Sequence, residues 1–208
     1  VYLADKKRPK ALLEELRNLA DKYGKRFKNS YSEPRIRGYI ALFDNDAATA
    51  AKFFEKANSI KPLQPDLVLI YMQTLASVGR AAEGEKLGFE LLAKNPAALA
   101  IYDVLYLQYV RENRLPEAEK ILQQKVDKNP KVPEAHLQLA AHYYTAKNQP
   151  AMMSTLQRME SDANSFPNAP MMVGDFFARI REYDLASQRY QDGAKRFPKE
   201  KAGYCLLY

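Results

Sequence analysis

The sequence predicts an all-α fold, in which one N-terminal helix precedes about five stacked helix-turn-helix hairpins. The first observation is a 34-residue period in proline, with one slot skipped, at Pro62, Pro96, Pro130 and Pro198. The second is that alanine keeps multiples of the same period, at Ala50, Ala118 and Ala186. The third is a composition with only 8 glycines in 208 residues and many good helix formers. A fixed period of this length is the signature of a helical repeat array.

The N-terminal segment, residues 1–30, is predicted to hold an amphipathic helix over residues 9–27. Leu12, Leu16, Leu19 and Tyr23 recur there at spacings of three and four, which places them on one helix face. This helix either caps the array or forms the second half of a preceding unit.

Each repeat is predicted to consist of a helix, a tight turn and a second helix. Proline ends the second helix, because it cannot continue a helix and biases its predecessor away from helical angles. Asn45, Gly79 and Asn113 share one column between the halves, and these residue types tolerate the left-handed backbone that closes a helix. The predicted units are 31–64, 65–98, 99–132, 133–166 and 167–200. Residues 201–208 are predicted to begin a further, truncated helix.

Small residues and aromatic residues recur at fixed positions in the two helices of a unit. The unit 31–64 carries Gly38, Ala50, Phe54, Ala57 and Pro62, and the unit 167–200 carries Gly174, Phe177, Ala186, Tyr190 and Pro198. This pattern resembles the tetratricopeptide repeat (TPR) family, although the middle units are degenerate and the family's favoured Trp is absent. The resemblance covers residues 31–200. It implies a right-handed α-solenoid whose first helices line a concave groove that binds a peptide or a partner domain.

The resemblance also implies which residues point into that groove, since each column of the first helix has a fixed direction. These residues combine apolar anchors with charges of both signs, which suits a peptide better than a polyanion. The candidate partner-binding residues are Arg35, Tyr39, Phe43, Leu69, Gln73, Asp103, Leu107, Arg111, Leu137, Tyr144, Met171, Asp175 and Arg179. Chaperone-binding members of the family clamp a C-terminal carboxylate with Lys, Asn and Arg. Tyr39 stands where that clamp needs Asn, so the clamp is absent.

Positive charge is concentrated near the N-terminus and supports an alternative function. Residues 1–37 hold 11 Lys and Arg against 5 Asp and Glu, so six of the seven net positive charges lie there. Nucleic-acid binding would use the cations Lys6, Lys7, Arg8, Lys10, Lys22, Lys25, Arg26 and Lys28. They are interleaved with acidic residues, which favours a solvated cap over a phosphate-binding face. A third interpretation is that the chain is the interaction module of a larger enzyme.

No catalytic or cofactor motif was found, so the sequence predicts a protein that is not an enzyme and holds no cofactor or metal. Phosphate-loop, nucleophile-elbow and zinc-protease patterns are missing. His136 and His142 lie six residues apart, on different faces of one helix. We expect His136 to be a partly buried packing residue and His142 to lie at the surface.

The ends of the chain predict a fragment or a processed protein from which a signal peptide has been removed. The chain begins at Val1 without an initiator Met and ends on apolar residues. No stretch approaches the roughly 20 apolar residues of a membrane span. The single cysteine, Cys205, is compatible with a reducing compartment and with a bacterial periplasm.

Overall fold

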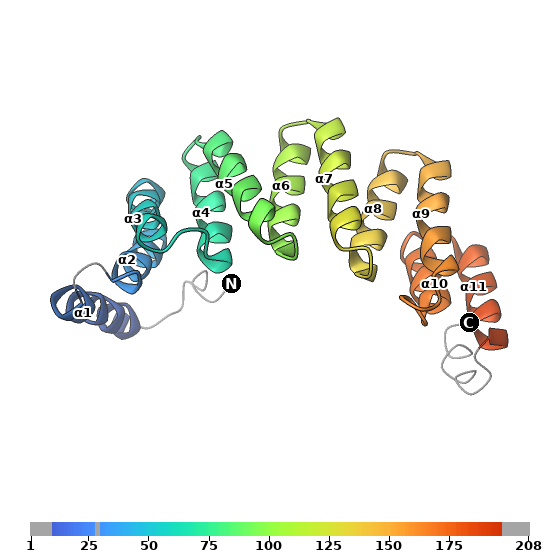
Figure 1. Ribbon diagram of the computed structural model, residues 1–208, viewed down its shortest axis with the longest axis horizontal. Coiled ribbons are helices and arrows are strands. Elements are labelled where there is room, and N and C mark those ends of the chain that lie inside the picture. The colour runs from blue at the N-terminus through green and yellow to red at the C-terminus, as the bar shows by residue number, and fades with distance from the viewer. Residues whose placement is uncertain (1–9, 28–29, 197–208) are drawn as a thin grey trace. The chain divides into compact units, whose positions relative to one another are not determined.

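The computed structural model describes residues 10–27 and 30–196, and this part of the chain is all-α, with eleven helices and no strand (Figure 1). The helices are α1 (Lys10–Arg26), α2 (Ser32–Phe43), α3 (Ala47–Ile60), α4 (Pro65–Ser77), α5 (Ala81–Lys94), α6 (Leu99–Arg111), α7 (Leu115–Lys128), α8 (Pro133–Thr145), α9 (Gln149–Ser161), α10 (Ala169–Arg179) and α11 (Tyr183–Arg196). The predicted helix at 201–208, the cations at 6, 7, 8 and 28, and Cys205 lie outside the described residues. None of the described helices is long and apolar enough to cross a membrane.

The chain divides into two compact units, residues 1–113 and 114–208. In the first unit α1 packs on α2, α2 on α3, α3 on α4, α4 on α5, and α6 contacts both α4 and α5. In the second unit α7 packs on α8, α8 on α9, α9 on α10, and α10 on α11. Each unit is therefore built from helices that pack mainly on their neighbours in sequence, as expected of a helical repeat.

Small residues in the first helix of a hairpin make room for a large residue in the second. A Cβ added to Gly38 would lie 2.3 Å from Cε1 of Phe54, and one added to Gly174 would lie 2.4 Å from Cε1 of Tyr190. Phe54 is fully buried, and its ring meets that of Tyr39 at 5.5 Å in an edge-on arrangement. Close approach of the helices in these hairpins thus depends on the glycines predicted to allow it.

The turn between paired helices uses one left-handed residue at the same column in every hairpin. Asn45, Gly79 and Asn113 have φ of 59°, 78° and 57°, as their residue types predict. Lys147 and Arg181 occupy the same column with φ of 57° and 66°. Their side chains gave no such signal, so here the packing of the two helices determines the turn against the local preference of the residue.

Substitutions in this column are expected to shift stability in opposite directions. A Cβ at Gly79 would meet nothing within 4 Å, so Gly79→Ala introduces backbone strain alone and should lower the free energy of unfolding by about 1 kcal/mol. Arg181→Gly relieves the same strain and should raise it by roughly 0.5 kcal/mol. Urea unfolding followed by circular dichroism measures both. A Gly79→Ala protein as stable as the parent would contradict the strain.

The prediction for His142 is wrong, because this side chain is buried and not at the surface. Its column contains Ile40, Thr74, Gln108 and Phe176, all of which are buried as well. Burial lowers the pKa of His142, and the charge of Glu119 opposes that shift. His136 is a packing residue as expected, but it is buried rather than partly buried, and its Nε2 lies 2.9 Å from the carbonyl oxygen of Pro130.

Candidate functional site

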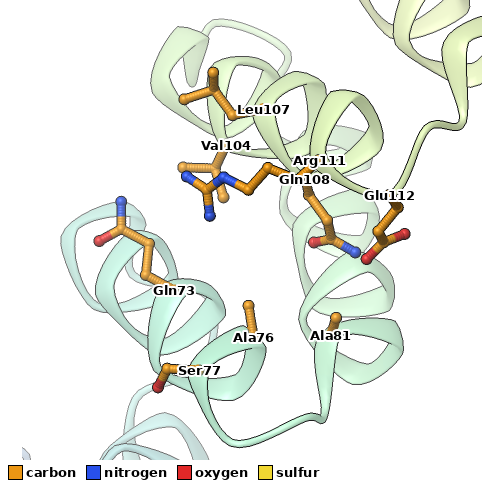
Figure 2. A pocket seen from close by; sticks show the side chains of 9 residues that line it. All are labelled: Gln73, Ala76, Ser77, Ala81, Val104, Leu107, Gln108, Arg111 and Glu112. Atoms are coloured by element: carbon orange, nitrogen blue, oxygen red, sulfur yellow. The ribbon is translucent and has the colours of Figure 1, made fainter.

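A pocket of about 290 Å³ opens in the first unit between α4 and α6, with the start of α5 at its base (Figure 2). We call it the α4–α6 pocket. It is lined by Gln73, Ala76, Ser77, Ala81, Val104, Leu107, Gln108, Arg111 and Glu112. Gln73, Leu107 and Arg111 were predicted from the sequence to bind a partner, and the structure brings them to one cavity.

The lining of the α4–α6 pocket combines an apolar wall with an exposed arginine. Ala76 and Ala81 have short side chains, and the space that they leave is the base of the cavity (Figure 2). Leu107 keeps 48% of its surface exposed although it is a large apolar residue. The side chain of Arg111 is exposed and makes no ion pair or hydrogen bond within the described residues. An exposed apolar side chain beside an unpaired arginine is typical of a binding surface.

The predicted residues of α2 are more deeply engaged in the fold of the first unit. Arg35 pairs with Asp66 of α4 at 2.8 Å, and its guanidinium carbon lies 5.4 Å from the centre of the Tyr31 ring. Tyr39 is half-buried against Phe54, and this burial raises the pKa of its hydroxyl group. Phe43, Leu69 and Asp103 are half-buried too. This end of the surface is therefore mostly occupied by internal contacts.

In the second unit Tyr144 is the most exposed of the predicted apolar side chains, at 43%. It lines a pocket of about 220 Å³ together with Lys147, Gln149, Met152, Ile180, Glu182 and Leu185. Arg179 is exposed as well, and Met171 is half-buried. This surface offers an aromatic anchor, but its lining contains a carboxylate and an ammonium group in the same small cavity.

Two other predicted residues of the second unit have structural roles. Leu137 packs against the buried cluster of Met159, Phe166 and Ala169. Asp175 accepts a hydrogen bond of 2.8 Å from the hydroxyl group of Tyr190. Burial of that hydroxyl group, with the bond to Asp175 as the next cause, raises the pKa of Tyr190 to about 12. Leu137 and Asp175 therefore contribute to the packing of the fold.

The basic segment offered as an alternative is described only in part. Lys22, Lys25 and Arg26 are exposed on α1. Acidic residues of α1 are engaged nearby, with Glu14 paired to Arg17 at 3.0 Å and Asp21 paired to Arg37 at 2.8 Å. The described cations are thus few, and they share the helix with carboxylates.

Solved structures with a similar fold were found, although no protein-family model and no curated protein matches the chain. Yeast Tom70 is 17% identical and matches 99% of this chain and 44% of its own, with a TM-score of 0.61. PilF of Pseudomonas aeruginosa is 12% identical, and the match covers 94% of this chain and 97% of PilF, with a TM-score of 0.51. TTC0263, a thermophilic TPR protein of Thermus thermophilus, is 18% identical. The match covers 86% of this chain and 98% of TTC0263, with a TM-score of 0.41.

The chain has a tetratricopeptide-like fold. The hairpins, the glycine–aromatic contacts and the likeness to Tom70 agree on it. At such identities the likeness shows the fold alone. Within this tetratricopeptide-like fold, the α4–α6 pocket lies between the first helices of two successive hairpins.

Gln108 is a lining residue that the sequence analysis missed. It occupies the same column as Ile40 and Phe176, so its burial could have been predicted from the period. The period could not predict that its side-chain nitrogen would be buried without a hydrogen-bond partner among the described residues. Partners of a side-chain amide depend on the positions of neighbouring groups, which a repeat pattern does not specify.

Proposed function

We propose that the chain is a non-enzymatic protein–protein interaction scaffold that binds a peptide or a partner domain along the first helices of its hairpins. The observation that carries the proposal is the α4–α6 pocket. It gathers Gln73, Leu107 and Arg111, of which Arg111 has no partner among the described residues and Leu107 is half exposed. Groups left free in this way are available to a partner, whereas Tyr39 and Asp175 are occupied.

The chemistry of the surface favours a protein over a polyanion. Asp66 is paired with Arg35, and Glu112 lines the pocket on the side away from the Arg111 guanidinium group (Figure 2). A nucleic-acid site would need clustered cations without such carboxylates. Protein interfaces, in contrast, combine apolar anchors with a polar rim.

The test is affinity capture from a lysate of the source organism with the parent chain and two double variants. Leu107→Ser/Tyr144→Ser removes one exposed apolar side chain from the first helices of each unit. Phe89→Ser/Tyr183→Ser removes comparable side chains from the second helices α5 and α11, and serves as the matched control. We expect the first variant to retain about a tenth or less of the partner, because central apolar contacts each contribute more than about 1 kcal/mol. The control should retain nearly all of it.

Other outcomes of the capture would contradict the proposal. Equal retention by both double variants would place the binding surface elsewhere. Retention that nuclease treatment abolishes would favour the basic segment, and binding that weakens steeply with salt would agree with it.

A further inference from the structure

Helix α1 carries an apolar stripe that the first unit leaves uncovered. Leu12 and Leu19 keep 40% and 42% of their surface exposed, and Leu16 and Tyr23 on the same face are half-buried. These four residues recur at spacings of four, three and four, so they form one seam along the helix. The adjacent face packs on α2, and Ala20 is fully buried there. The seam, which we call the α1 stripe, thus extends beyond the contact with α2.

The repeat period shows what covers this position elsewhere in the first unit. Leu16 and Tyr23 lie 34 residues before Ala50 and Ala57 of α3, and both alanines are fully buried. α3 packs on α2, the first helix of its own hairpin, and also on α4. α1 packs on α2, the helix that follows it, and no described helix precedes it (Figure 1). The α1 stripe therefore occupies a position that an antiparallel helix covers in the next hairpin.

The edge of the α1 stripe that lies away from α2 carries opposite charges at its two ends. Glu15 and Lys22 border the stripe there, seven residues apart, and both are exposed. Neither makes an ion pair or a hydrogen bond within the described residues. Arg26, at the end of the helix, has its guanidinium carbon 5.5 Å from the centre of the Phe27 ring. This edge is therefore acidic toward the N-terminus of α1 and basic toward its C-terminus.

Two copies of α1 would match these charges if they paired antiparallel about a twofold axis. In an antiparallel pair of helices, the same edge of each helix meets along the seam, so Glu15 of either copy faces Lys22 of the other. In a parallel pair Glu15 and Lys22 would instead face the edge that holds Ala20 and Phe27, where no opposite charge lies. The charge pattern thus favours a second copy in the antiparallel orientation.

We propose that the α1 stripe binds the α1 stripe of a second copy of this chain, antiparallel about a twofold axis, and so forms a homodimer. This inference does not depend on the proposed scaffold function. α1 has 17 residues and is about 25 Å long, so the helix pair buries less than the roughly 1,600 Å² of a standard interface. The dimer is therefore weak, with a dissociation constant on the order of 10 µM. It carries two α4–α6 pockets, which would strengthen binding to a partner with two matching segments.

Sedimentation equilibrium of the whole chain measures the dimer, from about 1 µM to about 500 µM protein at about 150 mM salt. Leu12→Ser/Leu19→Ser removes two exposed apolar side chains from the α1 stripe and should weaken dimerisation at least roughly tenfold. Phe89→Ser is the matched control, because Phe89 of α5 is 40% exposed like Leu12 but lies outside the stripe. Its dissociation constant should equal that of the parent. Circular dichroism checks that each variant keeps its helices.

Charge reversal tests the antiparallel geometry. Glu15→Lys and Lys22→Glu each give the two edge positions the same charge, so both ion pairs of the dimer become repulsive. Each single variant should therefore dimerise at least roughly fivefold more weakly than the parent. The double variant Glu15→Lys/Lys22→Glu restores opposite charges and should regain the dissociation constant of the parent. An equimolar mixture of the two single variants should associate as tightly as the parent, because each copy then faces the opposite charge.

Several results would overturn the proposal. They are a chain that stays monomeric up to about 500 µM, a dimer unchanged by Leu12→Ser/Leu19→Ser, and a double charge reversal that fails to restore the dimer. A species larger than a dimer would also overturn it, because a twofold contact closes with two copies. A monomer that sediments with vesicles of phosphatidylserine and phosphatidylcholine would assign the α1 stripe to a membrane surface instead.

Discussion

Gly38→Ala is expected to lower the free energy of unfolding by about 2 kcal/mol. The new Cβ would lie 2.3 Å, 2.5 Å and 2.9 Å from three carbons of the Phe54 ring, distances that require atoms to move. The ring is fully buried and contacts Tyr39 at 5.5 Å and Tyr71 at 6.3 Å between ring centres, so it has no free space to enter. Overpacking of this kind costs about 3 kcal/mol, which the higher helix propensity of alanine offsets by about 1 kcal/mol.

Urea unfolding followed by circular dichroism measures this loss, and Gly24→Ala is its control. Gly24 is an exposed helical glycine of α1, and the nearest atom to an added Cβ there is Cγ of the flexible Glu33 side chain, at 3.3 Å. This variant should be as stable as the parent or more stable by up to about 1 kcal/mol. If Gly38→Ala were equally stable, Phe54 could not be fixed against the α2 backbone as described.

The sequence alone predicts most of this fold, because in a helical repeat the residues that contact each other recur at a fixed separation along the chain. Phe54 lies 16 residues from Gly38, and Tyr190 lies 16 residues from Gly174, so one period shows both contacts. The left-handed turn column is equally periodic. Lys147 and Arg181 were missed there because residue type was considered and column position was not.

The same distinction explains the error at His142. Considered alone, a histidine on a helix is compatible with the surface. Considered in its column with Ile40 and Phe176, it occupies a buried position. In a repeat, the column in which a residue lies determines whether its side chain is buried, and the polarity of the side chain does not.

The candidate site is less predictable than the fold, for a physical reason. The columns of the first helix place Arg111, Tyr39 and Asp175 on related faces, but whether each is free depends on its particular neighbours. Tyr39 packs on Phe54, and Asp175 accepts a hydrogen bond from Tyr190. Arg111 finds no partner among the described residues and so remains available. Side-chain reach and hydrogen-bond geometry, which vary within a column, separate binding residues from structural ones.

Phe177→Ala is expected to have the largest effect on stability, a loss of about 3–5 kcal/mol in the free energy of unfolding. Phe177 of α10 is fully buried, its ring lies 5.7 Å from that of Phe176, and the guanidinium carbon of Arg189 lies 5.8 Å from its centre. Alanine would leave a cavity and remove the aromatic surface on which Arg189 rests. Arg189 also pairs with Glu160 at 2.8 Å, so this ion pair would lose its support.

Phe89→Ala is the matched control, because Phe89 of α5 loses the same atoms but keeps 40% of its surface exposed. A partly exposed ring contributes less transfer free energy and leaves no closed cavity, so the loss there should stay near about 1 kcal/mol. Both variants are compared by urea unfolding of the whole chain. Similar losses for the two would mean that the space around Phe177 collapses after truncation. A loss confined to Phe177→Ala would mean that α10 and α11 hold a rigid contact, which Gly174 and Tyr190 complete on the neighbouring turn.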